Sequence, residues 1–115
     1  MLYLVSKPLP LSEGRYDVSR LATDDLVQLV RDAHASGTLE SRIHYASTAS
    51  AIRAMANVDV RTTSLAGDPY ITDADTIIEI RLKPGKEKGP VIAGDLEFWE
   101  LKYTSPTAWP AIVND

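Results

Sequence analysis

Four polar side chains lie close together in the middle of the chain, where a predicted strand is followed by a predicted helix. They are His44, Tyr45, Ser47 and Thr48. Ser47 or Thr48 is expected to cap the helix with its side-chain oxygen, and the free N–H groups of the first helical turn then attract anions, phosphates above all. The stretch therefore predicts either a phosphate or nucleotide site or an ordinary capped surface helix.

Acid–base chemistry at this stretch depends on two side chains. A lone histidine such as His44 is more often a hydrogen-bonding loop residue than an acid or a base. Tyr45 can stack on a base or donate a hydrogen bond to phosphate, but with an ordinary pKa of about 10 it is a poor general acid at neutral pH. The residue types favour holding a phosphate over transferring a proton to it.

Positive charge for an anion is available from Arg61 and from the loop 84–94, which contains Lys86 and Lys88. Such a basic loop is usually solvated surface. If the loop is functional, we expect it to act as a basic flap that covers an anion bound at the start of the helix.

A metal or cofactor is not expected. The chain has no cysteine and two histidines, so thiolate sites and cysteine nucleophiles are excluded. The carboxylates of Asp68, Asp73, Asp75 and Glu79 do not have the spacing of a calcium loop, and we interpret them as turn and surface residues. No Walker loop, dinucleotide fingerprint or catalytic triad motif is present.

The composition is that of one ordinary globular domain. The chain has 115 residues, of which 44% are hydrophobic and 24% charged. A net charge of −4 argues against a protein that coats duplex nucleic acid, because that binding needs many cationic contacts to phosphate. No apolar run approaches the roughly 20 residues of a membrane span. We expect a cytoplasmic protein.

Hydrophobic periodicity predicts a small mixed β-sheet flanked by two helices, which is an α+β fold. Residues 1–104 are expected to form a single domain, and 105–115 a tail with two prolines and Trp109. The first helix is expected to begin at an N-cap on Thr23 and to end before Gly37, and the second to end near Asn57. The predicted strands are 2–5, 15–21, 38–43, 58–65, 76–83 and 96–104.

Two of these strands have informative faces. In 76–83, Ile78 and Ile80 share one face while Glu79 and Arg81 share the other, which indicates one solvent-facing side. The strand 96–104 is apolar on both sides, so a partner subunit or the tail is expected to cover one of them.

The order of these segments resembles the viral ring nucleases that act as type III anti-CRISPR proteins, and the resemblance runs from Leu2 to about Tyr103. The pieces that carry it are Leu2-Tyr3-Leu4, Gly14-Arg15-Tyr16, Ile43-His44-Tyr45-Ala46-Ser47-Thr48-Ala49, Asp59-Val60-Arg61, Ala74-Asp75 followed by a loop at Gly89, and Leu96-Glu97-Phe98-Trp99-Glu100.

The resemblance implies a homodimer that encloses cyclic tetra-adenylate in a pocket across its two-fold axis. In that family a histidine just before the second helix is the catalytic acid, and an arginine and a glutamate in a later loop assist it. The histidine position falls on Tyr45 here, with His44 one residue earlier, and the later positions fall on Gly85 and Lys88. These departures favour binding over cleavage.

Three hypotheses follow. The first is a dimeric viral or prophage anti-defence protein that sequesters a cyclic nucleotide messenger, with no cofactor. Its expected ligand-binding residues are Tyr45, Ser47, Thr48, Arg61, Lys86 and Lys88. The second is a metal-independent ring nuclease in which His44 replaces the usual acid. The third is a protein–protein interaction module that uses the surface of Trp99, Tyr103 and Trp109.

Overall fold

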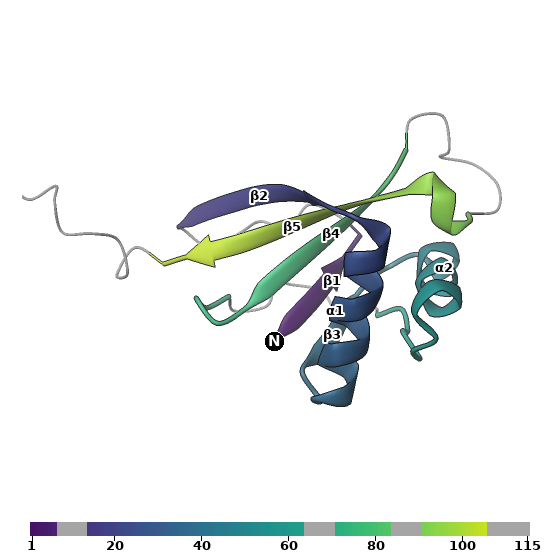
Figure 1. Ribbon diagram of the computed structural model, residues 1–115, viewed down its shortest axis with the longest axis horizontal. Helices are drawn as coiled ribbons and strands as arrows, with labels where there is room; N and C mark the ends of the chain where they lie inside the picture. The colour runs from purple at the N-terminus through teal and green to yellow at the C-terminus, as the bar shows by residue number, and fades with distance from the viewer. Residues whose placement is uncertain (7–13, 64–70, 84–90, 106–115) are drawn as a thin grey trace, which may run out of the picture.

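The computed structural model describes residues 1–6, 14–63, 71–83 and 91–105, which form a five-stranded mixed sheet and two α-helices (Figure 1). This confirms the predicted α+β class. The elements are β1 (Leu2–Val5), β2 (Arg15–Leu21), α1 (Thr23–Ala35), β3 (Leu39–Arg42), α2 (Ala46–Ala56), β4 (Thr76–Leu82), the 3₁₀ turn η1 (Ala93–Asp95) and β5 (Leu96–Thr104). No helix within these ranges is long and apolar enough to cross a membrane.

The strand β1 lies in the middle of the parallel part of the sheet. The strand order is β2-β5-β4-β1-β3, with β1 parallel to both β3 and β4, and β5 antiparallel to both β2 and β4. All four residues of β1 are buried. The short apolar run 2–5 therefore forms the doubly covered strand that its sequence predicts.

Both helices pack on one face of the sheet (Figure 1). Leu26 and Val30 of α1 and Ile52 of α2 meet Leu4 and Phe98 in one core cluster. The first helix has Ala22 as its N-cap and no side-chain cap, so the predicted cap on Thr23 is wrong: Thr23 is already helical. The carboxylates of the first turn provide favourable negative charge at this positive helix end without a capping hydroxyl.

The second face of the sheet carries a smaller apolar cluster of its own. It contains Tyr3, Val5, Ile71, Ile77, Leu101 and Tyr103, with Tyr16 and Trp99 packed against it. Ile77 is almost completely buried. The prediction that this side of 76–83 is solvent-facing is therefore wrong at its start, because Ile77 lies beside Tyr3 of β1.

The predicted strand 58–65 is not a strand in its described part, 58–63. Asn57 ends α2 in a left-handed conformation, and Val58 and Val60 then enter the core from an irregular segment. The guanidinium of Arg53 donates to the carbonyl of Val60, and the N–H of Thr63 donates to the carbonyl of Ile43 at 2.8 Å. These bonds replace a strand ladder. Residues 64 and 65 lie outside the described residues, as do 106–115 of the predicted tail.

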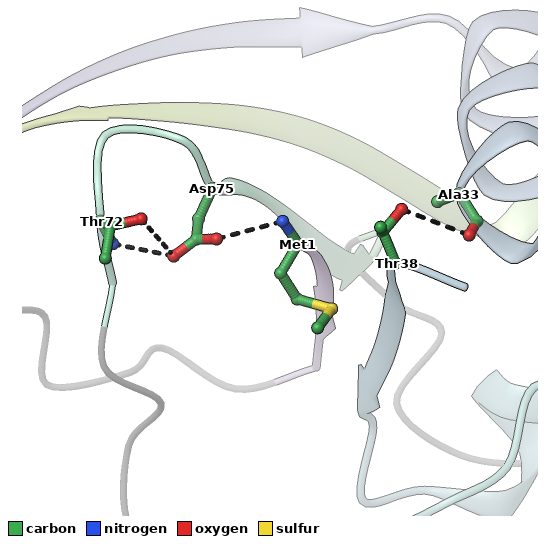
Figure 2. A network of polar contacts seen from close by, with 5 residues as sticks. All are labelled: Met1, Ala33, Thr38, Thr72 and Asp75. Carbon is green, nitrogen blue, oxygen red and sulfur yellow. Dashed lines mark hydrogen bonds and ion pairs between the residues drawn. The ribbon is translucent and has the colours of Figure 1, made fainter. Parts of the chain in front are cut away.

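A carboxylate anchors the beginning of β1 to the beginning of β4 (Figure 2). Asp75 accepts hydrogen bonds from the N–H of Thr72 at 2.8 Å and from its hydroxyl at 3.1 Å, and lies 3.1 Å from the N-terminal ammonium of Met1. Burial acts to raise the pKa of Asp75, but these three contacts outweigh it and lower the pKa below its ordinary value. The carboxylate is held in its charged form at the point where the parallel pair begins.

Gly14 makes room for the ring of Tyr103. A Cβ atom at this position would stand 2.2 Å from Cε1 of Tyr103 and 2.8 Å from the carbonyl oxygen of Thr104. We expect Gly14→Ala to lower the free energy of unfolding by about 1–3 kcal/mol, the usual range for overpacking. Gly94→Ala is the matched control, because a Cβ atom there meets nothing within 4 Å. Equal denaturant midpoints for the two variants would contradict this account.

Asp75→Asn is expected to lower the free energy of unfolding by about 1 kcal/mol at neutral pH, since it weakens three polar contacts of one side chain. A carboxyl with a lowered pKa in the folded state stabilises the fold above its unfolded-state pKa, about 3.9, and loses that effect as the pH falls through the folded-state value. The difference between wild type and variant in urea unfolding should therefore disappear in acid. The exposed Asp17→Asn serves as control, and a difference that persists at low pH would contradict the assignment.

Candidate functional site

A pocket of about 370 Å³ forms where β1 ends and its neighbour β4 continues. Val5, the last residue of β1, pairs with Glu79, while β4 runs on to Leu82. The start of α2 lies on the other side of the pocket, opposite the part of β4 that extends beyond β1. The lining residues are Ser6, Tyr45, Thr48, Glu79, Ile80, Arg81, Leu82 and Leu96.

The amino end of α2 meets this pocket without a side-chain cap. Tyr45 is the N-cap residue, and the first intrahelical bond runs from the N–H of Ala49 to the carbonyl of Tyr45 at 3.1 Å. The predicted cap on Ser47 or Thr48 is therefore wrong, because the helix begins before both residues. The N–H groups of the first turn precede that bond, and they carry the positive end of the helix dipole.

Thr48 and Ser47 differ in what they face. Thr48 lines the pocket and is only 5% exposed, which makes it the one buried polar side chain among the described residues. Ser47 is exposed and does not line the pocket. Tyr45 is 49% exposed and borders the pocket from the helix start.

The position of His44 is fixed through its backbone. Its N–H donates to the hydroxyl oxygen of Ser6 at 3.0 Å, which connects the end of β1 to the start of α2. The residue is exposed and is not part of the pocket lining. Ser6 lines the pocket, and His44 does not.

Arg81 is the cation of this pocket. Its guanidinium forms two hydrogen bonds to the carboxylate of Glu79, from Nε at 2.7 Å and from a terminal nitrogen at 3.1 Å. The hydrogen bond to Glu79 raises the pKa of Arg81 above its ordinary value, and the Cζ atom lies 5.4 Å from the ring centre of Trp99. Because its side chain is 51% exposed, Arg81 presents a fixed positive charge to solvent at the pocket.

The structure places Arg61 at a different site from Tyr45 and Thr48. Arg61 lines a second pocket, of about 390 Å³, with His34 and Ser41, and it pairs with Asp59 at 2.9 Å. The hydrogen bond from Arg61 lowers the pKa of Asp59. Lys86 and Lys88 lie outside the described residues.

Sequence reasoning did not find Ser6, Glu79 or Arg81. The alternation within 76–83 predicts only that Glu79 and Arg81 face away from the main core. Their place beside α2 depends on the parallel pairing of β1 with β4, and no local pattern in the chain indicates that pairing.

Trp99 and Tyr103 do not form an exposed apolar patch. Tyr103 is buried and packs on Tyr16 with ring centres 5.1 Å apart. Trp99 is half-buried, with the guanidinium groups of Arg20 and Arg81 over its ring. Trp109 lies outside the described residues. Across the ranges that the structure describes, no three His, Asp or Glu side chains gather as a metal site would require.

The fold is similar to that of B116 of Sulfolobus turreted icosahedral virus. The match has a TM-score of 0.67 at 16% sequence identity and covers 88% of this chain and 97% of that one. No protein-family model and no curated protein sequence matches the chain. The likeness to the viral protein establishes a shared fold.

From the charges in the pocket we expect substitutions of Arg81 and Glu79 to change the affinity for an anion in opposite directions. Arg81→Gln removes the cation and should weaken binding of adenosine monophosphate about three- to tenfold, whereas Glu79→Gln removes the competing carboxylate and should strengthen it by a similar factor. Isothermal titration calorimetry measures both. Arg61→Gln, in the second pocket, is the matched control. A loss of affinity in Arg61→Gln as large as in Arg81→Gln would locate the anion site elsewhere.

Proposed function

We propose that this chain is an anti-defence protein of viral or prophage origin that binds and sequesters a cyclic nucleotide second messenger in the cytoplasm of the host cell. The observation that carries the proposal is the pocket at the uncapped start of α2, bordered by Tyr45 and Thr48 and supplied with positive charge by Arg81. The shared fold with a virus protein supports the viral origin.

The chemistry of the pocket suits a phosphate attached to a base. Free N–H groups at a helix start and a guanidinium are both favourable partners for phosphate oxygens. The hydroxyls of Ser6 and Thr48 add neutral hydrogen-bond donors, and the ring of Tyr45 offers a surface on which a base can stack. A binding protein needs these features and no catalytic acid.

The size of the pocket supports a site shared by two copies of the chain. About 370 Å³ is near the lower end of the range of roughly 300–1,000 Å³ that small-molecule sites occupy. A cyclic oligonucleotide exceeds such a volume, so a second protomer would be needed to enclose it. This agrees with the homodimer that the sequence resemblance implies.

Sequestration is favoured over cleavage by the positions of two side chains. Tyr45, which occupies the place of the family's catalytic histidine, borders the pocket, while His44 lies outside the lining. A tyrosine hydroxyl is a weaker acid than an imidazolium and does not readily protonate a leaving oxygen at neutral pH.

The test is to incubate the protein with cyclic tri-, tetra- and hexa-adenylate, collect the protein by filtration, denature it by heat and analyse the released nucleotides by chromatography. Recovery of an intact ring is the expected result. Recovery of linear products would show a ring nuclease instead. If the protein depletes none of the three rings, this proposal and the nuclease alternative are both wrong.

Thr48→Val tests the pocket without changing side-chain shape, and should weaken binding of the captured ring by about tenfold through loss of one hydrogen bond to a charged group. Ser47→Ala removes a hydroxyl from the adjacent residue, outside the pocket lining, and should leave the affinity unchanged. A larger loss in Ser47→Ala would contradict this placement of the ligand.

A further inference from the structure

A third hollow, of about 400 Å³, lies next to the pocket at α2 and shares Leu96 with it. It is formed where β2 leads into α1, beside the end of β4 and the beginning of β5. Its polar lining includes Arg20, Thr23, Lys83 and Glu97. Two cations therefore line a hollow that adjoins the pocket of Arg81.

Arg20 and Arg81 approach one indole from the two strands on either side of β5. The Cζ atom of Arg20 lies 5.2 Å from the ring centre of Trp99, and that of Arg81 lies 5.4 Å from it. Stacking on an aromatic ring fixes a guanidinium in place and leaves its N–H edge available to an anion. Trp99 thus holds one arginine for each hollow.

Each of these arginines also has a glutamate next to it. Arg81 donates two hydrogen bonds to the carboxylate of Glu79, whereas Arg20 makes a single long contact with Glu97 at 3.7 Å. The Arg20 side chain is 52% exposed. The weaker pairing leaves the charge of Arg20 less compensated than that of Arg81.

The spacing suits consecutive phosphates of one strand. Both guanidinium carbons lie close to the same ring, so their separation cannot exceed the sum of the two Cζ–ring distances, and two phosphates joined by one nucleoside can contact both arginines. Lys83 extends the same row of charge at the end of β4.

We propose that Arg20 and Lys83 form a second phosphate subsite, so that one protomer holds two neighbouring phosphates of an oligonucleotide, one at each hollow. This rests on the proposed function and deepens it, because it assigns a second phosphate of the ligand to named residues of the same protomer. Trp99 acts as a positioning residue that sets the distance between the two arginines.

The experiment compares linear tri-adenylate carrying a 5′-phosphate with adenosine monophosphate, using calorimetry at several salt concentrations. Arg20→Gln and Lys83→Gln should each weaken binding of the trinucleotide about threefold and reduce the slope of log affinity against log salt by roughly 0.7, the value for one phosphate contact of a single strand. Both variants should bind the mononucleotide as wild type does. Arg15→Gln, at the opposite end of β2, and Lys102→Gln, near the end of β5, are the matched controls for removal of one charge.

The possible outcomes separate the two proposals. Equal affinity for the trinucleotide and the mononucleotide, or equal losses in the controls, would overturn the second subsite and leave the pocket at α2 in place. Equally tight binding of inorganic tripolyphosphate would also overturn it, because that would indicate a general polyanion surface. No binding of the linear trinucleotide would overturn the subsite, whereas the proposed function is decided separately by whether the protein captures a cyclic adenylate.

Discussion

Because β1 pairs in parallel with both β3 and β4, the carboxyl ends of these strands lie at one edge of the sheet, beside the start of α2. The candidate site depends on this pairing. If β1 were two residues longer it would cover the edge of β4 that now borders the pocket. The four-residue strand thus determines both the position of the hollow and which residues of β4 line it.

Two effects act on the positive charge at the site: Glu79 partly neutralises it, and the same contact fixes its orientation. A net negative chain repels polyanions at long range, and only local groups can overcome that repulsion. Arg81 supplies charge that Glu79 partly neutralises, while the bidentate contact and the ring of Trp99 keep the guanidinium in one orientation. In the proposed site the glutamate would therefore lower the affinity for a single phosphate while keeping the guanidinium oriented, which would favour ligands that make further contacts elsewhere.

The sequence predicts the fold well where the spacing of apolar residues within one segment indicates which of its faces are buried. The run 2–5 indicates a central strand, and the helical spacing of Leu26 and Val30 indicates the face of α1 that packs on the sheet. It fails where a neighbour from another part of the chain decides the outcome. Ile77 is buried by Tyr3, Val60 is held by Arg53, and α2 begins at a residue without a capping side chain.

The residues of the candidate site also fall into those that the sequence indicates and those that it does not. Tyr45 and Thr48 are identifiable because they stand beside a predictable helix start, and both line the pocket. Arg81 is not identifiable, because only tertiary pairing brings it there. Arg61 carries the positive charge that a phosphate site needs, but it lines another pocket, where it forms an ion pair with Asp59.

The position of β1 also has a consequence for how the chain reaches its native state. The partner of Leu2 in β4 is Thr76, which at roughly 5–20 residues per second is synthesised several seconds after Leu2. The contacts between β4 and β5 and those between α1 and β3 are local and can form early, whereas the pairing of β1 with β4 and that of β2 with β5 close the longest loops of the sheet. The apolar residues 2–5 must therefore remain without β4 until Thr76 and the residues after it are synthesised, and the pocket can form only once β1 lies between β3 and β4.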